Sequence, residues 1–426
     1  MNQKELEKKA RAYALKNALA YDGKAQQGAV ISALFHEGLK KEDMKKYGRV
    51  ISEIVNEVNK FSLEEQKEKF ENLEKEVSER EHREGLEELP NAKKGKVIMR
   101  FRPSPSGPLH VGHIISNILN SLYVKKYKGK FYVIIDDTDP ETIQKDAYKN
   151  IKKDCDWIFG NVAKYINSSD RMNLYYKYAE KLIKLGKAYV CTCSSEKFKK
   201  FSEFKEDCPC RNNELKENIY RWKKMLDTEN KKFSVSQTSK EKQEIRDKSS
   251  KGYKEGEAVL RFKTLEGMED KNPAMRDFPL ARINLTQHPR QKKKYRVWPL
   301  MNLAVSVDDI ELKMTHIIRG KDHRDNAERQ KMFFKVFGKK YPWTFFMGRI
   351  KFKDLALSKR KITEAIKSGK FSGIEDERLP TIASLRKRGY NPKVFERFAE
   401  QRGLTEVDKV FDSREFFLFL ENFNGE

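Results

Sequence analysis

The sequence predicts an α/β protein whose parallel sheet is flanked along the chain by helical segments. Three observations predict this class. Residues 96–135 read as strand, helix and strand, the pattern of a βαβ unit. Leu, Ala, Ile and Val recur at helical spacing before residue 90, and helical patterns return after Leu379. The chain has 426 residues, enough for roughly two to four domains.

Residues 1–92 are expected to form an N-terminal helical domain. The stretches "ELEKKARAYALKNALAYDG" and "VISEIVNEVNKF" carry the helical periodicity. Ser62 followed by Glu65 is a capping box, which predicts a largely charged helix over residues 63–82. The polar segment "LPNAKKGK" then separates this part from the βαβ unit.

The βαβ unit consists of the strand "KVIMRF", the loop "RPSPSGP", the helix "HVGHIISNILNSLYVKKY" and the strand "GKFYVIID". A glycine-containing loop that leads into a helix N-terminus favours an anion, because free backbone N–H groups and the helix dipole meet there. Gly112 lets a ligand approach the backbone, and His110 and His113 share one face of the first turn. These histidines are therefore candidate hydrogen-bond donors to phosphate oxygens. A metal-binding pair or two incidental surface histidines are the alternatives.

Later segments extend this pattern. "VWPLMNLAVSVDD" and "MTHIIRGKDH" predict that the parallel sheet resumes after a long insertion. Within the insertion, residues 228–256 are polar and charged with little periodicity, which predicts a flexible excursion. The basic run "HPRQKKKYR" contains an aromatic residue and is either a phosphate contact or a solvated loop.

Four of the five cysteines form two pairs: Cys191 with Cys193, and Cys208 with Cys210. Four thiolates in two pairs suit tetrahedral Zn²⁺, although C-x-C is tighter than the usual spacing. Four reduced cysteines without a metal are the alternative. Cys155 lies apart from them and is expected to be a core thiol.

The amino-acid composition indicates which partners and which cellular compartment to expect. Lys and Arg number 89 against 64 Asp and Glu, a net charge of +25 that suits nucleic acid or an anionic membrane surface. A generally lysine-rich composition is the alternative explanation. We see no signal peptide and no apolar run of about 20 residues, so we expect a soluble, cytoplasmic protein.

Several blocks, taken in order, resemble one enzyme family. "RFRPSPSGPLHVGH" resembles the HIGH signature of class I aminoacyl-tRNA synthetases in their glutamyl/glutaminyl branch, and "IIDDTDPE" resembles that branch's "DDTDP" block. "YRVWPLMNLAVSVDD" and "THIIRGKDHRDNAERQ" are similar to its later active-site blocks, and "LALSKRKI" to its KMSKS loop. The N-terminal helices with "GKAQQGAV" resemble the extra domain of archaeal glutamyl-tRNA synthetases. Agreement of several ordered blocks is far more specific than any one motif.

The resemblance implies a Rossmann-type catalytic domain in two halves, residues 93–190 and 296–378. It also implies an inserted acceptor-binding domain with the zinc knuckle at residues 191–295. A helical stem-contact domain is expected at residues 379–426. The implied activity is ATP- and Mg²⁺-dependent activation of L-glutamate and its transfer to tRNA-Glu or also tRNA-Gln, by an enzyme that is expected to be a monomer.

The resemblance also assigns roles to individual residues. His110, Gly112, His113, Ser358 and Lys359 match the ATP-binding and catalytic motifs, with both histidines and the lysine stabilising phosphate charge. The residues that match the glutamate site are Arg100, Ser104, Asp136, Met301 and Arg319. Guanidinium groups suit bidentate carboxylate binding, and Asp136 matches the acidic residue for the α-amino group. Surface ion pairs for the arginines, and turn or cap roles for Ser104 and Asp136, are the alternatives.

The chain also departs from the family pattern. Met301 replaces a usual tyrosine in the amino-acid pocket, and Arg102 is an extra cation where alanine is frequent. No segment resembles the family's C-terminal anticodon-reading domain, which is a β-barrel in archaeal members. Two further functions are therefore kept as alternatives: glutamyl transfer to a modified base of tRNA-Asp, and non-catalytic tRNA binding.

Overall fold

The chain folds into two compact units, Met1–Arg83 and Glu84–Glu426. The computed structural model describes residues 2–21, 23–78, 85–227, 252–355 and 357–422. Most of the predicted excursion at 228–256 lies outside these ranges. Across the described helices, none combines the length and the apolar character needed to span a membrane.

The first unit is helical. Buried Leu and Ala side chains of the first helix pack against apolar side chains of the second and third in one core. The predicted capping box is confirmed, since Ser62 Oγ accepts the Glu65 N–H and Glu65 Oε2 accepts the Ser62 N–H. The predicted helix over 63–82 is wrong in length: its charged sequence offers little apolar surface for packing, and it ends at Glu71. The helices are α1 (Gln3–Ala20), α2 (Gln27–His36), α3 (Met44–Val58) and α4 (Leu63–Glu71).

The predicted βαβ unit is confirmed in the second unit. β1 (Ile98–Phe101) leads through α5 (Val111–Lys126) to β2 (Lys130–Ile135), and the two strands pair in parallel. β2 continues through α6 (Ala147–Phe159) to β3 (Val162–Asn167), which also pairs in parallel. β1 and β2 are short and largely apolar, and most of their buried side chains form one core with α5 and α6.

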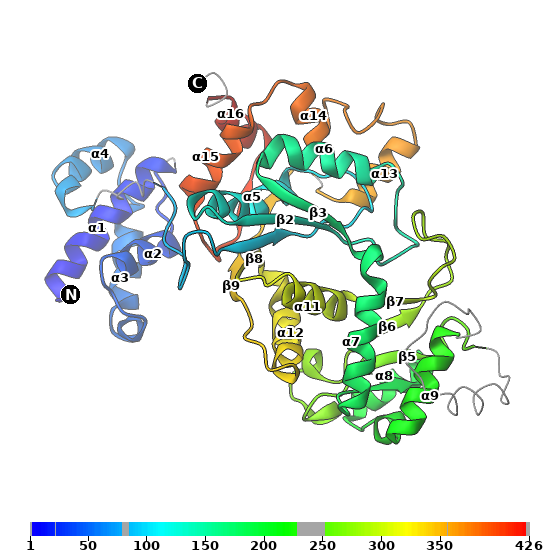
Figure 1. Ribbon diagram of the computed structural model, residues 1–426. Coiled ribbons are helices and arrows are strands. Elements are labelled where there is room, and N and C mark those ends of the chain that lie inside the picture. Colours follow the sequence, from blue (N-terminus) through cyan, green and yellow to red (C-terminus); the bar gives the residue numbers. More distant parts are fainter. Residues whose placement is uncertain (1, 22, 79–84, 228–251, 356, 423–426) are drawn as a thin grey trace, which may run out of the picture. The chain divides into compact units, whose positions relative to one another are not determined.

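A second parallel pair lies on the other side of β1. β8 (His316–Gly320) pairs with β9 (Trp343–Met347), and Thr315, directly before β8, donates its backbone N–H to the Ile98 carbonyl at 3.0 Å. Ile98 in turn donates its N–H to Thr315 Oγ1 at 2.9 Å. The helices that follow β1 and β8 lie on opposite sides of these two strands (Figure 1), which makes the carboxyl ends of β1 and β8 a topological switch point where α/β folds bind ligands. Figure 1 shows α5, α6 and α15 (Pro392–Arg402) on one side of these strands, and α11 (Met301–Glu311) and α12 (Arg324–Val336) on the other.

The insertion forms an antiparallel sheet in the order β4-β5-β6-β7. We expected the segment containing β7 to resume the parallel sheet, and this was wrong: Trp298 pairs with Arg282 of β6. All three residues of β7 are buried, so no alternation in the sequence indicated which sheet it joins. The strands are β4 (Ala188–Cys191), β5 (Val259–Phe262), β6 (Pro279–Ile283) and β7 (Val297–Pro299), accompanied by α7 (Met172–Lys184), α8 (Ser195–Phe204) and α9 (Leu215–Leu226).

The loop that connects β6 to β7 is anchored to the loop that follows β2. The buried His288 ring accepts the backbone N–H groups of Arg290 and Gln291 at Nδ1, so its proton lies on Nε2. Nε2 then donates to the Asp137 carbonyl oxygen at 3.0 Å. This hydrogen bond holds the inserted sheet close to Asp136, the residue that directly precedes Asp137 in the sequence.

The C-terminal segment completes the second unit. α15 packs on α5, and Gly348, after β9, lies so close to residues 406–407 that a Cβ there would be 2.0 Å from the Val407 oxygen. A short strand within the segment predicted to be helical pairs in parallel with the strand after Gly348. The remaining elements are β10 (Ile350–Phe352), α13 (Lys359–Lys367), α14 (Ile382–Lys387), β11 (Lys409–Phe411) and α16 (Ser413–Asn422).

Candidate functional site

A cavity of about 640 Å³ opens at the carboxyl ends of β1 and β8, at the switch point. Nine predicted site residues line it: Arg100, Ser104, His110, Gly112, His113, Asp136, Met301, Arg319 and Lys359. Ser358, the remaining non-cysteine residue of the prediction, is not among the lining residues. It caps α13 by accepting the Lys361 N–H at 3.4 Å. Residues from distant parts of the sequence thus meet in one place.

The two histidines lie together at the N-terminus of α5. The backbone N–H of His110 donates to His113 Nδ1 at 3.2 Å, so the His113 ring carries its proton on Nε2. His110 Nδ1 is buried and has no hydrogen-bond partner within the described residues. Burial, together with the nearby Lys359 charge, lowers the pKa of His110 to about 3. Burial also holds the pKa of His113 well below its ordinary value. Both rings are neutral at pH 7 and suited to a ligand that brings acceptors or negative charge.

Gly112 lies between these histidines and against the KMSKS-like segment. A Cβ at Gly112 would lie 2.9 Å from Leu357 Cδ1 and 3.3 Å from the His110 ring. Such a contact is too short for any larger residue without displacing one of the two neighbours. Glycine is therefore required here by packing as well as by the approach of a ligand.

Lys359, the first residue of α13, brings a cation to the same cavity. Its Nζ donates to the Ser104 carbonyl oxygen at 2.7 Å. Burial lowers the pKa of Lys359 to about 8. No ion pair with a carboxylate is present for Lys359 in the described part of the chain, which leaves its charge available to an anionic ligand.

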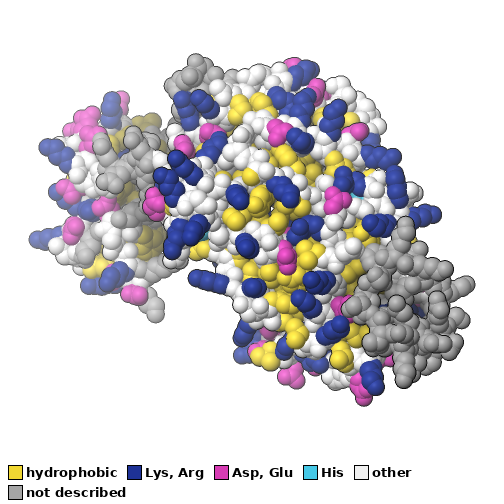
Figure 2. Space-filling view, viewed as in Figure 1, with side chains coloured by type: hydrophobic (Ala, Val, Ile, Leu, Met, Phe, Trp, Pro, Cys, Tyr) yellow, Lys and Arg dark blue, Asp and Glu magenta, His cyan; other side chains and the backbone are white. Residues whose placement is uncertain are grey.

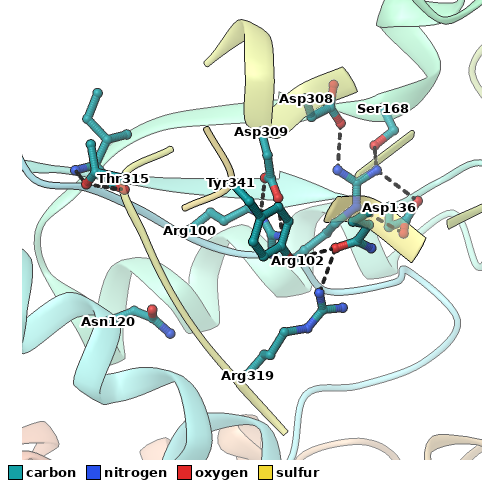
Figure 3. Close-up of polar contacts among 12 residues, drawn as sticks. Arg100, Arg102, Asn120, Asp136, Ser168, Asp308, Asp309, Thr315, Arg319 and Tyr341 are labelled. Carbon is teal, nitrogen blue, oxygen red and sulfur yellow. Dashed lines mark hydrogen bonds and ion pairs between the residues drawn. The ribbon is translucent and has the colours of Figure 1, made fainter. Parts of the chain in front are cut away.

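On the β1 side of the cavity, two arginines of its lining are held by two adjacent carboxylates of α11. Arg100 makes a bidentate ion pair with Asp309, Nε to Oδ1 at 2.5 Å and Nη2 to Oδ2 at 2.8 Å. Arg102 Nη1 donates to Asp308 Oδ2 at 2.6 Å, and its Nε donates to Asp136 Oδ2 at 3.1 Å (Figure 3). Burial disfavours the Arg102 charge, but Asp136 and Asp308 offset this and hold its pKa well above the ordinary value.

Arg319, at the end of β8, has a different environment. Its Nη1 donates to the neutral amide oxygen of Gln330 at 2.9 Å, and Tyr341 donates to the same oxygen at 3.1 Å (Figure 3). In the described ranges Arg319 forms no ion pair with a carboxylate. Burial and the neighbouring Arg100 charge lower its pKa. Its guanidinium group is therefore a charged donor without a counter-ion, as an anion-binding residue requires.

Several residues in or beside the cavity were not predicted. Asp308 and Asp309, which lie outside the cavity lining and hold Arg100 and Arg102, were given no role, although adjacent acids at a helix end were a visible signal. Arg349 and Arg402 also line the cavity, and Arg402 Nη2 donates to the Gly348 carbonyl oxygen at 2.9 Å. Arg402 comes from α15, and no local pattern indicates that this helix reaches the site.

The four paired cysteines converge next to β4. Their sulfur atoms all lie within 4.8 Å of one another, and all four are free thiols. Four sulfurs around tetrahedral Zn²⁺, each about 2.3 Å from the metal, are separated by roughly 3.8 Å. The pairs at 3.3, 3.5 and 3.9 Å are close to this spacing. The donor set therefore fits the metal. Cys155, as expected, is buried in the core of the parallel sheet.

The geometry agrees with the family to which comparison assigns the chain. The family model "tRNA synthetases class I (E and Q), catalytic domain" matches residues 96–419, so this chain belongs to the class I tRNA synthetases of that group. Among curated proteins it is similar to the glutamate–tRNA ligase of Methanocaldococcus jannaschii, 39% identical over 407 residues, which cover 95% of this chain and 68% of the relative. It is also similar to the glutamate–tRNA ligase of Pyrococcus furiosus, 40% identical over 417 residues, with 95% and 68% covered.

A solved structure supports the fold. Among solved structures, the chain is similar to the crystal structure of a glutamate tRNA ligase from Elizabethkingia meningosepticum in complex with its amino acid. The TM-score is 0.51 at 19% sequence identity, over 77% of this chain and 69% of that chain. The class I synthetase catalytic fold, mixed α/β with parallel sheets, is thereby confirmed.

Proposed function

We propose that the chain acts as a glutamate–tRNA ligase, which converts L-glutamate and ATP to glutamyl-adenylate and transfers the glutamyl group to the 3′ end of tRNA-Glu. The observation that carries the proposal is the pairing of two kinds of group in one cavity. His110, His113 and Lys359 suit a triphosphate, and Arg319 is a cation that a carboxylate would neutralise. The family and the two archaeal relatives support the same activity.

In the first step, an α-carboxylate oxygen of glutamate attacks the α-phosphorus of ATP. The bond from this phosphorus to the bridging oxygen breaks, and pyrophosphate leaves with the electron pair. His113 Nε2–H and the His110 ring would donate to phosphate oxygens as their charge increases, and Lys359 would neutralise the leaving pyrophosphate. In the second step, a ribose hydroxyl of the terminal adenosine attacks the glutamyl carbonyl carbon, loses its proton, and AMP leaves.

Glutamate itself would lie between β1 and β8. Arg319 would bind one of its two carboxylates, because its fork is free of carboxylates within the described residues. Asp136 would accept the ammonium group, and Arg100 and Ser104 would complete the site from the β1 side. Met301, which is 39% exposed at the start of α11, would contact the aliphatic part of the substrate.

Two metals belong to this proposal. Mg²⁺ would enter bound to ATP, since Asp308 and Asp309 are buried and paired with arginines, and Asp136 is assigned to the ammonium group of glutamate. It would neutralise phosphate charge. Zn²⁺ would be held by Cys191, Cys193, Cys208 and Cys210 and would stabilise the inserted domain beside β4.

The tRNA would be recognised largely through its phosphates. The net charge is +25, and Figure 2 shows Lys and Arg side chains distributed over the drawn face with fewer acidic side chains among them. The inserted sheet, with the basic loop after His288, would contact the acceptor end. A monomer is the proposed state, because the resembled branch of the family is mostly monomeric.

The test is a charging assay with ATP, radiolabelled glutamate or glutamine, and total tRNA. We expect glutamate to form a base-labile product that is lost when the tRNA is first oxidised with periodate, as an ester at the 3′ end requires. A product that survives oxidation would support glutamylation of a modified base instead. No product with either amino acid would refute an enzymatic role and leave non-catalytic tRNA binding.

A further inference from the structure

We propose that Arg102 is a positioning residue of the amino-acid site, which holds the Asp136 carboxylate in the orientation that accepts the substrate's ammonium group. The inference rests on the proposed function and adds to it a residue that the motifs do not assign. Arg102 follows β1 directly and lines the cavity. Its side chain is only 6% exposed.

The donors of Arg102 are almost fully used within the protein. Nε donates to Asp136 Oδ2 at 3.1 Å, and Nη1 to Asp308 Oδ2 at 2.6 Å. Nη2 donates to Ser168 Oγ at 2.9 Å and to Asp136 Oδ1 at 3.4 Å (Figure 3). A guanidinium group has five N–H donors, and these contacts occupy four of them. Arg102 is therefore poorly suited to bind a substrate carboxylate and acts on its neighbours instead.

Asp308, the partner of Arg102 on α11, is held rigidly. Asp308 is fully buried and also accepts from Arg171 Nε at 2.6 Å and from the Tyr175 hydroxyl at 2.8 Å. Its position on α11 is thus fixed from three sides. Arg102 is hydrogen-bonded to Asp308, and the same guanidinium group donates two hydrogen bonds to the Asp136 carboxylate, which fixes the orientation of that carboxylate.

Asp136, the other partner of Arg102, faces the ligand. Asp136 lines the cavity and is 20% exposed. Its Oδ1 accepts from Thr138 Oγ1 at 3.2 Å and from Arg102, while Oδ2 accepts from Arg102 alone among the described residues. A carboxylate has about four lone-pair directions, so one direction on Oδ2 is left for an ammonium donor. The two contacts from one planar fork prevent the carboxylate from rotating away.

The test measures ATP–pyrophosphate exchange in the presence of tRNA, with the KM values for glutamate and ATP determined separately. We expect Arg102→Gln to raise the KM for glutamate about tenfold, the size of a lost charge-assisted contact, and to change the KM for ATP less than about twofold. Arg102→Lys keeps the charge but loses the fork, so an intermediate increase is expected.

A double-mutant cycle separates positioning from general damage. If Arg102 acts through Asp136, Arg102→Gln should have no further effect on the glutamate KM in an Asp136→Asn background. Arg386→Gln is the matched control, since Arg386 makes a comparable ion pair with the buried Asp154 at 2.7 Å but does not line the cavity; its glutamate KM should stay within about twofold of wild type.

Three results would overturn the inference: an undiminished Arg102→Gln effect in the Asp136→Asn background, an equal effect of Arg386→Gln, or an unchanged glutamate KM in Arg102→Gln. If thermal unfolding shows that Arg102→Gln does not fold, Arg102→Lys decides, and an unchanged glutamate KM in that variant overturns the inference. A wild-type protein without glutamate-dependent exchange would refute the proposed function itself. Normal wild-type exchange with unaffected variants would refute only the role of Arg102.

Discussion

Lys359 Nζ donates a hydrogen bond to the backbone carbonyl oxygen of Ser104 at 2.7 Å. The contact joins the first turn of α13 to the loop after β1, across 255 residues of sequence. A phosphate ligand is a stronger acceptor for an ammonium group than a neutral carbonyl. The lysine is therefore held at the cavity by a partner that an incoming triphosphate would replace.

Removal of this amine should reduce adenylate formation. We expect Lys359→Ala to lower kcat/KM for ATP about a hundredfold, because one charged donor to a developing phosphate charge is lost. ATP–pyrophosphate exchange measures the effect. Lys361→Ala, two residues further along the same helix, is the control and should retain near wild-type exchange. Equal losses in the two variants would contradict a specific role for Lys359.

The pH profile should reflect the same group. Because burial lowers the pKa of Lys359 to about 8, the free protein loses this charge as pH rises through 8. The protonated form is the active one, so kcat/KM for ATP should fall on the alkaline side of pH 8. Lys359→Arg keeps its charge to far higher pH, so the fall in kcat/KM for ATP should occur at a higher pH in this variant, whatever its maximal rate. An alkaline limb at the same pH in both proteins would assign it to another group.

Arg319 should govern glutamate binding rather than ATP binding. Arg319→Gln removes the guanidinium that has no carboxylate partner among the described residues, and we expect the glutamate KM to rise about 10- to 100-fold. The KM for ATP should change much less. Arg324→Gln, which breaks an exposed ion pair with Glu406 and a cation–π contact with Phe346 but no contact inside the cavity, should leave both values unchanged. A larger effect of Arg319→Gln on ATP than on glutamate would contradict the assignment.

Gly112 offers a steric test. A methyl group at Gly112 would lie 2.9 Å from Leu357 Cδ1, so Gly112→Ala should displace the His110 ring or the segment before α13. We expect the KM for ATP to rise about tenfold or more with little loss of folding stability. Gly28→Ala is the matched control, because no atom lies within 4 Å of the added carbon. Unchanged ATP binding in Gly112→Ala would show that the site tolerates this displacement.

The cysteine cluster predicts metal content directly. Cys191→Ser should lower the zinc stoichiometry from about one per chain and destabilise the inserted domain, since a structural zinc site uses all four ligands. Elemental analysis after dialysis measures the metal. Cys155→Ser removes a buried thiol outside the cluster and should leave the zinc content unchanged. Full zinc content in Cys191→Ser would rule out this ligand set.

Features that depend on neighbouring residues could be predicted from the sequence. His110, Gly112 and His113 occupy one helical turn, so their proximity follows from helix geometry alone. The Ser62 capping box and the β1-α5-β2 unit are local in the same sense. The paired cysteines were predicted to converge because thiolates at this spacing have few other uses.

Features that depend on tertiary contacts could not be predicted. Arg102 and Asp308 are 206 positions apart, and each alone reads as an ordinary surface charge. β7 is buried on both faces, so its sequence did not reveal that it joins the antiparallel sheet. The end of α4 at Glu71 depended on how little apolar surface the following residues offer to the core.

The contact between Ile98 and Thr315 also has a consequence for biosynthesis, since it joins positions 217 residues apart. Loop-closure entropy increases with the length of chain enclosed, so this pairing costs more than any pairing within the first three strands. At about 5–20 residues per second, a ribosome needs roughly 10–40 s to add that length. The nascent polypeptide therefore displays the His110 turn well before Arg319 exists. Translation that stalls within the insertion would leave a histidine-bearing half without its guanidinium counterpart, as a substrate for chaperones or proteases.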